Sequence, residues 1–125
     1  MGLGRNNMVG TIPSEYAGLT NLNTWGMERN EFTGTIPAAF STLTNLWRVA
    51  LDHNSLTGTI PTELASLTRL EKISVNGNFV SGTIPDELCA IADRLYIVAD
   101  CAAIYCPCCS ECCTERDLCY QHNTR

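Results

Sequence analysis

The sequence lacks the features of two large classes of protein. It has no run of the roughly 20 apolar residues that a membrane-spanning helix needs, because its most apolar segment, residues 95–106, is interrupted by Asp100. It also has no basic stripe, and its net charge is −5. We therefore expect no direct membrane insertion by this stretch of chain, no binding to an anionic membrane surface and no nucleic-acid partner.

Motifs for catalysis are missing as well. There is no glycine-rich phosphate loop, no kinase motif and no pair of carboxylates in a plausible cleft. His53 follows Asp52, but adjacent residues of a strand point to opposite faces or splay at a turn, and no serine or cysteine is placed as their nucleophile. The sequence therefore predicts no catalytic residues, no cofactor and no enzymatic activity.

Two marks of an extracellular protein are also absent. The first residues are not a signal peptide, because they lack a charged start followed by an apolar core. The chain contains no Asn-x-Ser/Thr sequence for glycosylation. Both absences stand against the cysteine content of the last third of the chain, which predicts an oxidising compartment.

What the sequence does contain is a repeat of 24 residues. Gly-Thr-Ile-Pro begins at Gly10, Gly34, Gly58 and Gly82. An asparagine recurs with the same spacing, at Asn6, Asn30, Asn54 and Asn78. Four copies in register predict a solenoid rather than a globule, and the period lies within the roughly 20–29 residues of leucine-rich repeats.

Each position of the repeat has a physical role. Val49 and Leu51 alternate with residues expected to be exposed, which is the period-2 pattern of a short strand. Pro61 then starts a helical turn. At the end of each strand, the sequence predicts an internal ladder of structural amides that satisfy buried polar groups. Its members are Asn30, Asn54 and Asn78.

The unit Leu-x-x-Leu-x-Leu-x-x-Asn-x-Leu-x-Gly-x-Ile-Pro resembles the plant-specific class of leucine-rich repeats, found in receptor-like proteins, receptor kinases and polygalacturonase-inhibiting proteins. The resemblance implies an α/β repeat: a right-handed leucine-rich-repeat solenoid with a parallel concave sheet, short helical turns and a second short strand at Leu-x-Gly-x-Ile-Pro. To this the sequence adds a cysteine-rich C-terminal cap. We assign residues 1–100 to the repeats and residues 101–125 to the cap.

The first repeat is truncated in this alignment. Met1 falls in the column of Trp25 and Val49, so the chain begins partway through a strand. A solenoid needs a polar cap at that end, because the first repeat otherwise exposes its core. We expect the chain to be the C-terminal part of a longer receptor-like protein.

All eight cysteines lie in the last third of the chain, at Cys89, Cys101, Cys106, Cys108, Cys109, Cys112, Cys113 and Cys119. An even number at the end of a repeat array predicts a disulfide-stapled cap, although the spacing does not determine the pairing. The alternative is a zinc or iron–sulfur site at Cys109-x-x-Cys112, but no second separated pair follows, and His122 is the only nearby histidine. Disulfides are favoured over metal, which places the chain outside the cytosol or on the outer face of the plasma membrane. The tail also resembles the ends of leucine-rich-repeat proteins from diatoms and related algae.

The resemblance implies that the concave sheet recognises a protein or peptide, with co-receptor contact and signalling as further expectations. The alignment gives one exposed column as Thr24, Arg48, Lys72 and Ile97. It gives the next column as Gly2, Gly26, Ala50, Ser74 and Ala99, small side chains that an extended partner could approach closely. The predicted binding residues are Glu28, Arg29, Trp47, Arg48, Asp52, His53, Lys72 and Asn76. The alternative for any one of them is an ordinary solvated strand face.

Two other functions are compatible with the repeat. The residues on either side of the repeat glycine are mostly threonine, at Val9, Thr11, Thr33, Thr35, Thr57, Thr59, Ser81 and Thr83. Rungs stacked roughly 4.8 Å apart would form a flat surface similar to that of ice-binding solenoids, although threonine is also an ordinary exposed strand residue. The resemblance to polygalacturonase-inhibiting proteins gives the second alternative, a glycosidase-inhibitor-like defence protein.

Overall fold

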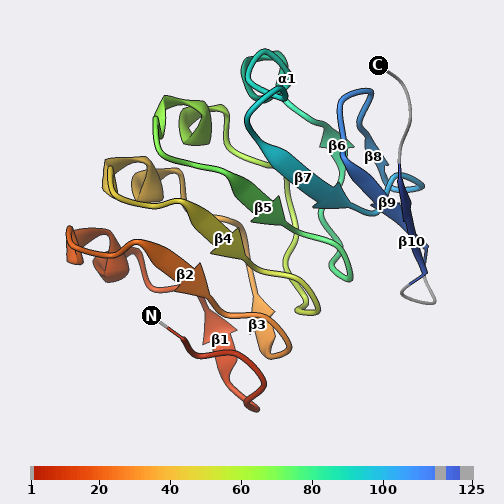
Figure 1. Ribbon diagram of the computed structural model, residues 1–125. Helices are drawn as coiled ribbons and strands as arrows, with labels where there is room; N and C mark the ends of the chain where they lie inside the picture. The colour runs from red at the N-terminus through yellow and green to blue at the C-terminus, as the bar shows by residue number, and fades with distance from the viewer. Residues whose placement is uncertain (1, 115–117, 122–125) are drawn as a thin grey trace.

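The computed structural model describes residues 2–114 and 118–121. In its main sheet, β10 (Cys119–Gln121) lies at one edge beside β9 (Glu111–Cys113), and β7, β5, β4 and β2 follow in that order. Four of these strands come from successive repeats and are parallel: β2 (Thr24–Gly26), β4 (Arg48–Ala50), β5 (Lys72–Ser74) and β7 (Tyr96–Ala99). Figure 1 shows them side by side, each one repeat further along the chain. This arrangement confirms the predicted solenoid with a parallel concave sheet.

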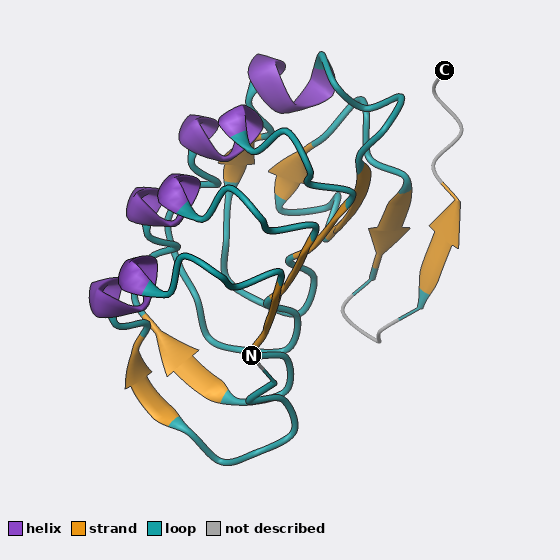
Figure 2. Ribbon diagram, turned by 60° about the vertical axis from the view of Figure 1, so that its left-hand side comes forward, coloured by secondary structure: helices purple, strands orange, loops and turns teal. Residues whose placement is uncertain are grey.

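Short helical turns lie along one edge of the solenoid, one for each repeat (Figure 2). Three are 3-10 turns, at Ser14–Gly18, Ala38–Thr42 and Thr62–Ser66, and the fourth is the α-helical turn α1 (Asp86–Cys89). A proline precedes each turn, at Pro13, Pro37, Pro61 and Pro85. Proline fits this position because the first backbone N–H of a helix has no intrahelical partner, so its absence costs nothing.

A second set of short strands lies at the repeat glycine. β1 (Val9–Thr11) pairs with β3 (Glu31–Thr33), and β6 (Gly82–Thr83) pairs with β8 (Ile104–Tyr105). The pairing is offset by two residues from the 24-residue repeat, because Thr11 lies opposite Thr33 rather than Thr35. Thr35 lies opposite Thr57 in the same way. The threonines are exposed, but their rows run diagonally across the repeats instead of stacking as straight rungs.

The core is a column of large apolar side chains between the sheet and the helical turns. Leu46, Leu64, Leu67 and Ile73 are among its fully buried members. At its N-terminal end, the ring of Trp25 lies against that of Phe40 with centroids 3.8 Å apart. Burial of this kind supplies about 25 cal/mol for each Å² of apolar surface removed from water, so stacking of repeats stabilises each one.

The asparagine column joins neighbouring repeats through buried hydrogen bonds. Asn54 Nδ2 donates to the backbone oxygens of Leu51 (3.1 Å) and of Met27 in the preceding repeat (2.9 Å). Asn54 Oδ1 accepts from the backbone N–H of Phe32 at 3.1 Å. Asn30 and Asn78 repeat this pattern with their own neighbours. The amides thus satisfy backbone groups that the turns leave without partners.

The last repeat differs from the sequence alignment by one residue. The structure pairs Lys72 with Tyr96 rather than with Ile97, and Ser74 with Val98 rather than with Ala99. The cause is α1, whose i→i+4 bonds, such as that from Ala90 N to Asp86 O, replace the 3-10 turn of earlier repeats. Leu95 therefore directly precedes the strand residue Tyr96, whereas its counterpart Leu70 lies two residues before Lys72. Aligning the two leucines misplaces the strand by one residue.

The cap extends the concave sheet instead of merely covering its end. β9 (Glu111–Cys113) runs parallel to β7, and β10 (Cys119–Gln121) pairs antiparallel with β9. The disulfides are Cys89–Cys108, Cys101–Cys112, Cys106–Cys109 and Cys113–Cys119. No cysteine remains free, so the cysteines are not available as thiolate ligands for zinc or an iron–sulfur cluster. His122, named with that alternative, lies outside the described residues.

Candidate ligand-binding groove

The small residues in the middle of the concave sheet do not form an open strip. Ala50 is completely buried, and Gly26 and Ser74 are buried too. The corrected register also places the larger Val98 in this column, where the sequence alignment had Ala99. Close approach of an extended partner to the centre of the sheet is therefore restricted, because the surface of these small residues is already buried.

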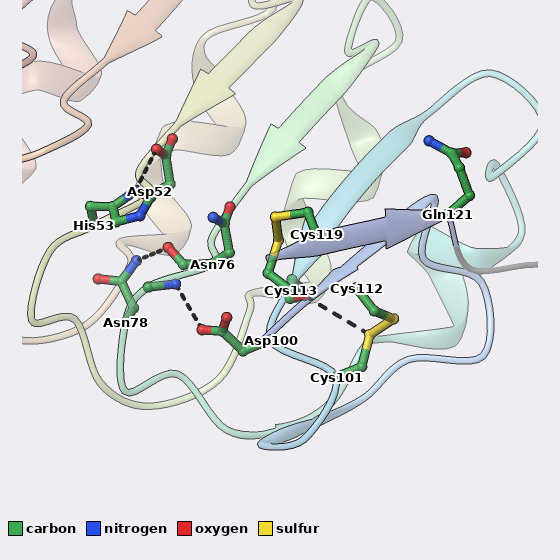
Figure 3. Close-up of a disulfide and its surroundings, with 12 residues drawn as sticks. Asp52, His53, Asn76, Asn78, Asp100, Cys101, Cys112, Cys113, Cys119 and Gln121 are labelled. Atoms are coloured by element: carbon green, nitrogen blue, oxygen red, sulfur yellow. Dashed lines mark hydrogen bonds and ion pairs between the residues drawn. A yellow bond between two sulfur atoms is a disulfide. The ribbon is translucent and has the colours of Figure 1, made fainter. Parts of the chain in front are cut away.

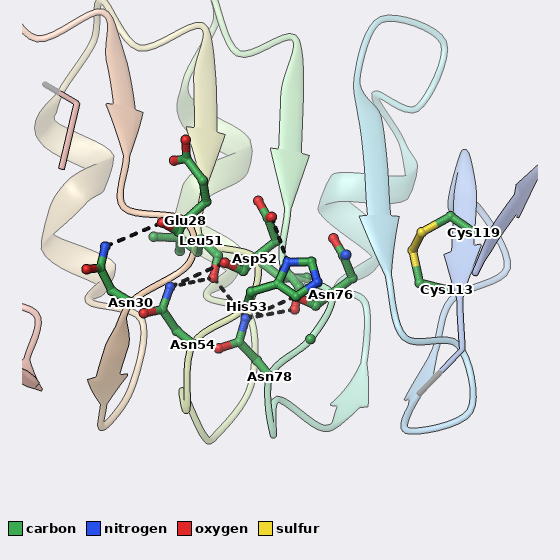
Figure 4. A network of polar contacts seen from close by, with 12 residues as sticks. Glu28, Asn30, Leu51, Asp52, His53, Asn54, Asn76, Asn78, Cys113 and Cys119 are labelled. Atoms are coloured by element: carbon green, nitrogen blue, oxygen red, sulfur yellow. Dashed lines mark hydrogen bonds and ion pairs between the residues drawn. A yellow bond between two sulfur atoms is a disulfide. The ribbon is translucent and has the colours of Figure 1, made fainter. Parts of the chain in front are cut away.

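A polar row lies where the concave strands end. Figure 4 shows Glu28, Asp52 and Asn76 projecting side by side from consecutive repeats. Asn76 is only 6% exposed, so it is less accessible than the sequence predicted. Glu28 is half-buried, and its Oε2 is a buried oxygen without a hydrogen-bond partner among the described residues. Arg29 is exposed at the outer end of this row.

His53 and Asp52 lie together, contrary to the expectation that adjacent residues diverge. His53 Nδ1 lies 2.9 Å from Asp52 Oδ2. His53 has a backbone φ of 59°, in the left-handed region, as does Arg29 with 58°. This conformation reverses the direction of the chain at the strand end and brings the imidazole back over the preceding side chain. Both side chains are 20% exposed, and their contact joins the turn to the end of the strand.

A concavity lies at the opposite, N-terminal ends of the concave strands. It is a groove of about 1420 Å³ that follows the sheet from the second repeat to the cap. Among its lining residues are Asn23, Asn45, Trp47, Arg69, Glu71, Asp93, Arg94, Tyr96, Ser110 and Gln121. Of the predicted binding residues, only Trp47 lines it directly, and the Trp47 side chain is 43% exposed.

Backbone pairing fixes the position of Trp47. Its N–H donates to Asn23 O (2.9 Å), and its carbonyl oxygen accepts from the N–H groups of Glu71 (2.8 Å) and Lys72 (3.1 Å). The backbone of Trp47 is therefore held by the repeats on either side, while the residue remains partly exposed. Arg48 and Lys72 follow directly on the concave face, paired side by side with Tyr96 in one row of the sheet.

The groove contains residues that the sequence argument did not select. Arg69 and Asp93 continue the 24-residue column of Asn21 and Asn45, which is exposed except at the half-buried Asn45, so the repeat alone could have identified them. Tyr96 was missed through the alignment error at Leu95. Gln121 and Ser110 come from the cap, and no periodicity could have placed them beside the repeats.

Other kinds of site are not evident in the part of the chain that the structure describes. Within residues 2–114 and 118–121, no three His, Cys, Asp or Glu side chains gather as a metal site. No helix in these ranges combines the length and apolarity needed to cross a bilayer.

The repeats, the asparagine column and the stapled cap together define a leucine-rich-repeat protein. The family model described as Leucine Rich Repeat matches residues 45–67 and 69–91. A search of the curated proteins found no match.

Similar solved structures are ectodomain structures of plant receptors. The ectodomain of the Arabidopsis thaliana receptor kinase GASSHO1/SCHENGEN3, solved with Casparian strip integrity factor 2, is 32% identical with a TM-score of 0.74, over 79% of this chain and 12% of that one. The BIR3–SERK2 complex from Arabidopsis thaliana is 35% identical with a TM-score of 0.69, over 75% of this chain and 51% of that one. The Arabidopsis receptor kinase HAESA, solved with the peptide hormone IDA and the co-receptor SERK1, is 33% identical with a TM-score of 0.71, over 77% of this chain and 16% of that one. The chain thus spans from about an eighth to about half of these proteins.

Proposed function

We propose that the chain is a non-catalytic recognition module of an extracellular or cell-surface leucine-rich-repeat protein, and that it binds a protein or peptide on its concave side. The observation that carries this proposal is the groove beside Trp47, where a partly exposed aromatic ring stands among polar side chains. Exposed aromatic residues in concave surroundings are the usual anchors of protein recognition.

Two further findings support the proposal. Four disulfides are stable in an oxidising compartment and rare in the cytosol, which favours an extracellular location. HAESA, a structural neighbour, is a receptor kinase solved with a peptide hormone and a co-receptor, and the same class of partner suits a groove that crosses several strands. The row at the other strand ends, with Glu28, Arg29, Asp52 and His53, would then form the opposite rim.

The test is selection of random phage-displayed peptides on the oxidised, folded chain. Binding of the enriched peptides is then compared between the chain, a Trp47→Ala variant and a Tyr105→Ala control. Tyr105 is an exposed aromatic residue on β8 that does not line the groove. We expect Trp47→Ala to weaken binding at least tenfold, since truncation of an aromatic anchor costs about 2 kcal/mol or more, and Tyr105→Ala to leave it unchanged. Failure to enrich any peptide, or equal binding by both variants, would contradict the proposal.

A further inference from the structure

The groove borders a row of positive charge on an acidic chain. Arg69 and Arg94 line it, and Arg48 and Lys72 stand in the adjoining row of the sheet. The carboxylates of the lining are those of Glu71 and Asp93. The two arginines and two carboxylates of the lining cancel, and Arg48 and Lys72 bring the charge of lining and row together to +2, whereas the whole chain carries −5.

The cations are held by neutral partners. Arg69 Nη1 donates to the side-chain oxygen of Asn45 at 3.1 Å. Arg94 Nη1 donates to the backbone oxygens of Thr68 (3.2 Å) and Leu70 (3.1 Å). Lys72 Nζ lies 5.7 Å from the ring centroid of Tyr96. These contacts fix the positions of the charges without neutralising them.

Neither arginine nor Lys72 forms an ion pair with Glu71 or Asp93, because the pair of His53 and Asp52 is the one ion pair found among the described residues. A cation that keeps its charge and is already ordered loses little conformational entropy when a ligand arrives. Such a cation also contributes more to the attraction of an anion than one already paired with a carboxylate. The arrangement is therefore suited to receive negative charge from outside the chain.

We infer that the ligand of this groove is an acidic peptide segment, with an apolar or aromatic residue against Trp47 and carboxylates facing Arg69, Arg94 and Lys72. The inference rests on the proposed function, since it names the chemistry of the partner in the same groove. A neutral segment would leave the excess positive charge of lining and row without a counter-charge, and a basic segment would add to that excess.

The same peptide selection tests this inference. Among peptides whose binding depends on Trp47, we expect a net negative charge, although the total charge of the chain would repel acidic peptides. Binding of these peptides should weaken as NaCl rises from about 0.05 to about 0.5 M, because added salt screens exposed charges. Peptides in which every Asp and Glu is replaced by Asn and Gln are the control and should bind weakly.

Single-residue variants show which arginines contribute to the affinity for an acidic peptide. Arg69→Gln and Arg94→Gln should each lower the affinity for an acidic peptide about tenfold, as expected for loss of a charge-assisted hydrogen bond. Arg5→Gln, an exposed arginine outside the groove, should leave the affinity unchanged. Because Arg94 also holds backbone oxygens, Arg94→Lys retains the charge and should keep more affinity than Arg94→Gln.

The outcomes separate the two ideas. If Trp47-dependent peptides are enriched but are neutral or basic, or bind the arginine variants as well as the original chain, the acidic-ligand inference is wrong while the recognition function stands. If no enriched peptide depends on Trp47, the proposed function fails and the inference fails with it.

Discussion

The side-chain amide of Gln121 donates a hydrogen bond of 3.0 Å to the hydroxyl of Tyr96. Gln121 belongs to β10, the last strand of the cap, and Tyr96 begins β7, the last strand of the repeats. Both residues line the groove. The cap therefore completes one wall of the candidate binding site in addition to covering the end of the hydrophobic core.

The contact between Gln121 and Tyr96 should contribute to peptide affinity as a unit. We expect Gln121→Ala and Tyr96→Phe each to weaken binding of a Trp47-dependent peptide, and the double variant to lose less than the sum of the two. The coupling energy should be about 0.5–1 kcal/mol, in the range of a hydrogen bond near the surface. Binding titrations of the four proteins measure it, and strictly additive losses would show that the two residues act independently.

Removal of the Cys113–Cys119 bond should affect the groove as well as the stability of the fold. This disulfide joins directly opposite residues of β9 and β10 and thereby holds the strand that carries Gln121 (Figure 3). The double variant Cys113→Ser/Cys119→Ser should bind the peptide several-fold more weakly, with a loss of about 2 kcal/mol in stability, because the closed loop is short.

The matched control is the Cys89–Cys108 bond, which ties α1 of the last repeat to the cap. Its longer loop predicts a loss of about 3 kcal/mol for Cys89→Ser/Cys108→Ser. Urea denaturation of both double variants compares the two bonds. If Cys113→Ser/Cys119→Ser lost more stability than Cys89→Ser/Cys108→Ser, then strain or residual structure in the unfolded chain, rather than loop length, would determine how much each disulfide stabilises the fold.

The asparagine column should contribute to stability according to burial. Asn54→Ala removes the buried partners of Phe32 N, Leu51 O and Met27 O, and we expect a loss of about 3 kcal/mol. Asn6 occupies the equivalent position but is exposed, and its amide bonds only within its own turn, to Leu3 and Gly4. Asn6→Ala should cost less than about 1 kcal/mol. Equal losses in thermal or urea unfolding would contradict the assigned role of the buried ladder.

The two tryptophans should be distinguishable by fluorescence. Trp25 is completely buried, and its indole N–H donates to the sulfur of Met27, whereas Trp47 is exposed in the groove. Trp47→Phe should leave a blue-shifted emission that acrylamide quenches weakly. Trp25→Phe should leave a red-shifted emission that is quenched strongly. If the variant that retains only Trp47 is shielded from acrylamide, the groove is less open than described.

Much of the fold could be predicted because it is periodic. Val49 and Ile73 occupy equivalent places in their repeats, and each packs against its counterpart in the next strand, so identical spacing in the chain becomes adjacency in space. The parallel sheet, the helical turns after proline and the role of Asn54 all follow from this property. The same reasoning failed at Leu95, where a different helical turn shifted one apolar residue relative to its strand.

The candidate site was less predictable, because side-chain contacts depend on local backbone conformation and on the cap. The left-handed backbone of His53 turns its ring onto Asp52, which strand alternation does not anticipate. Ala50 was expected to be exposed on the basis of its place in the strand, but it is completely buried. The groove itself combines columns from several repeats with two cap residues.

The repeat, its strand register up to Ser74 and the eight cysteines at one end can all be read from the amino-acid sequence, because each repeat of a solenoid contacts only its neighbours and a linear period therefore becomes structure. The tertiary structure decided which cysteines pair, where the groove opens and how Gln121 meets Tyr96. Those features join segments without a shared period, and their proximity depends on how the cap folds back against the last repeat.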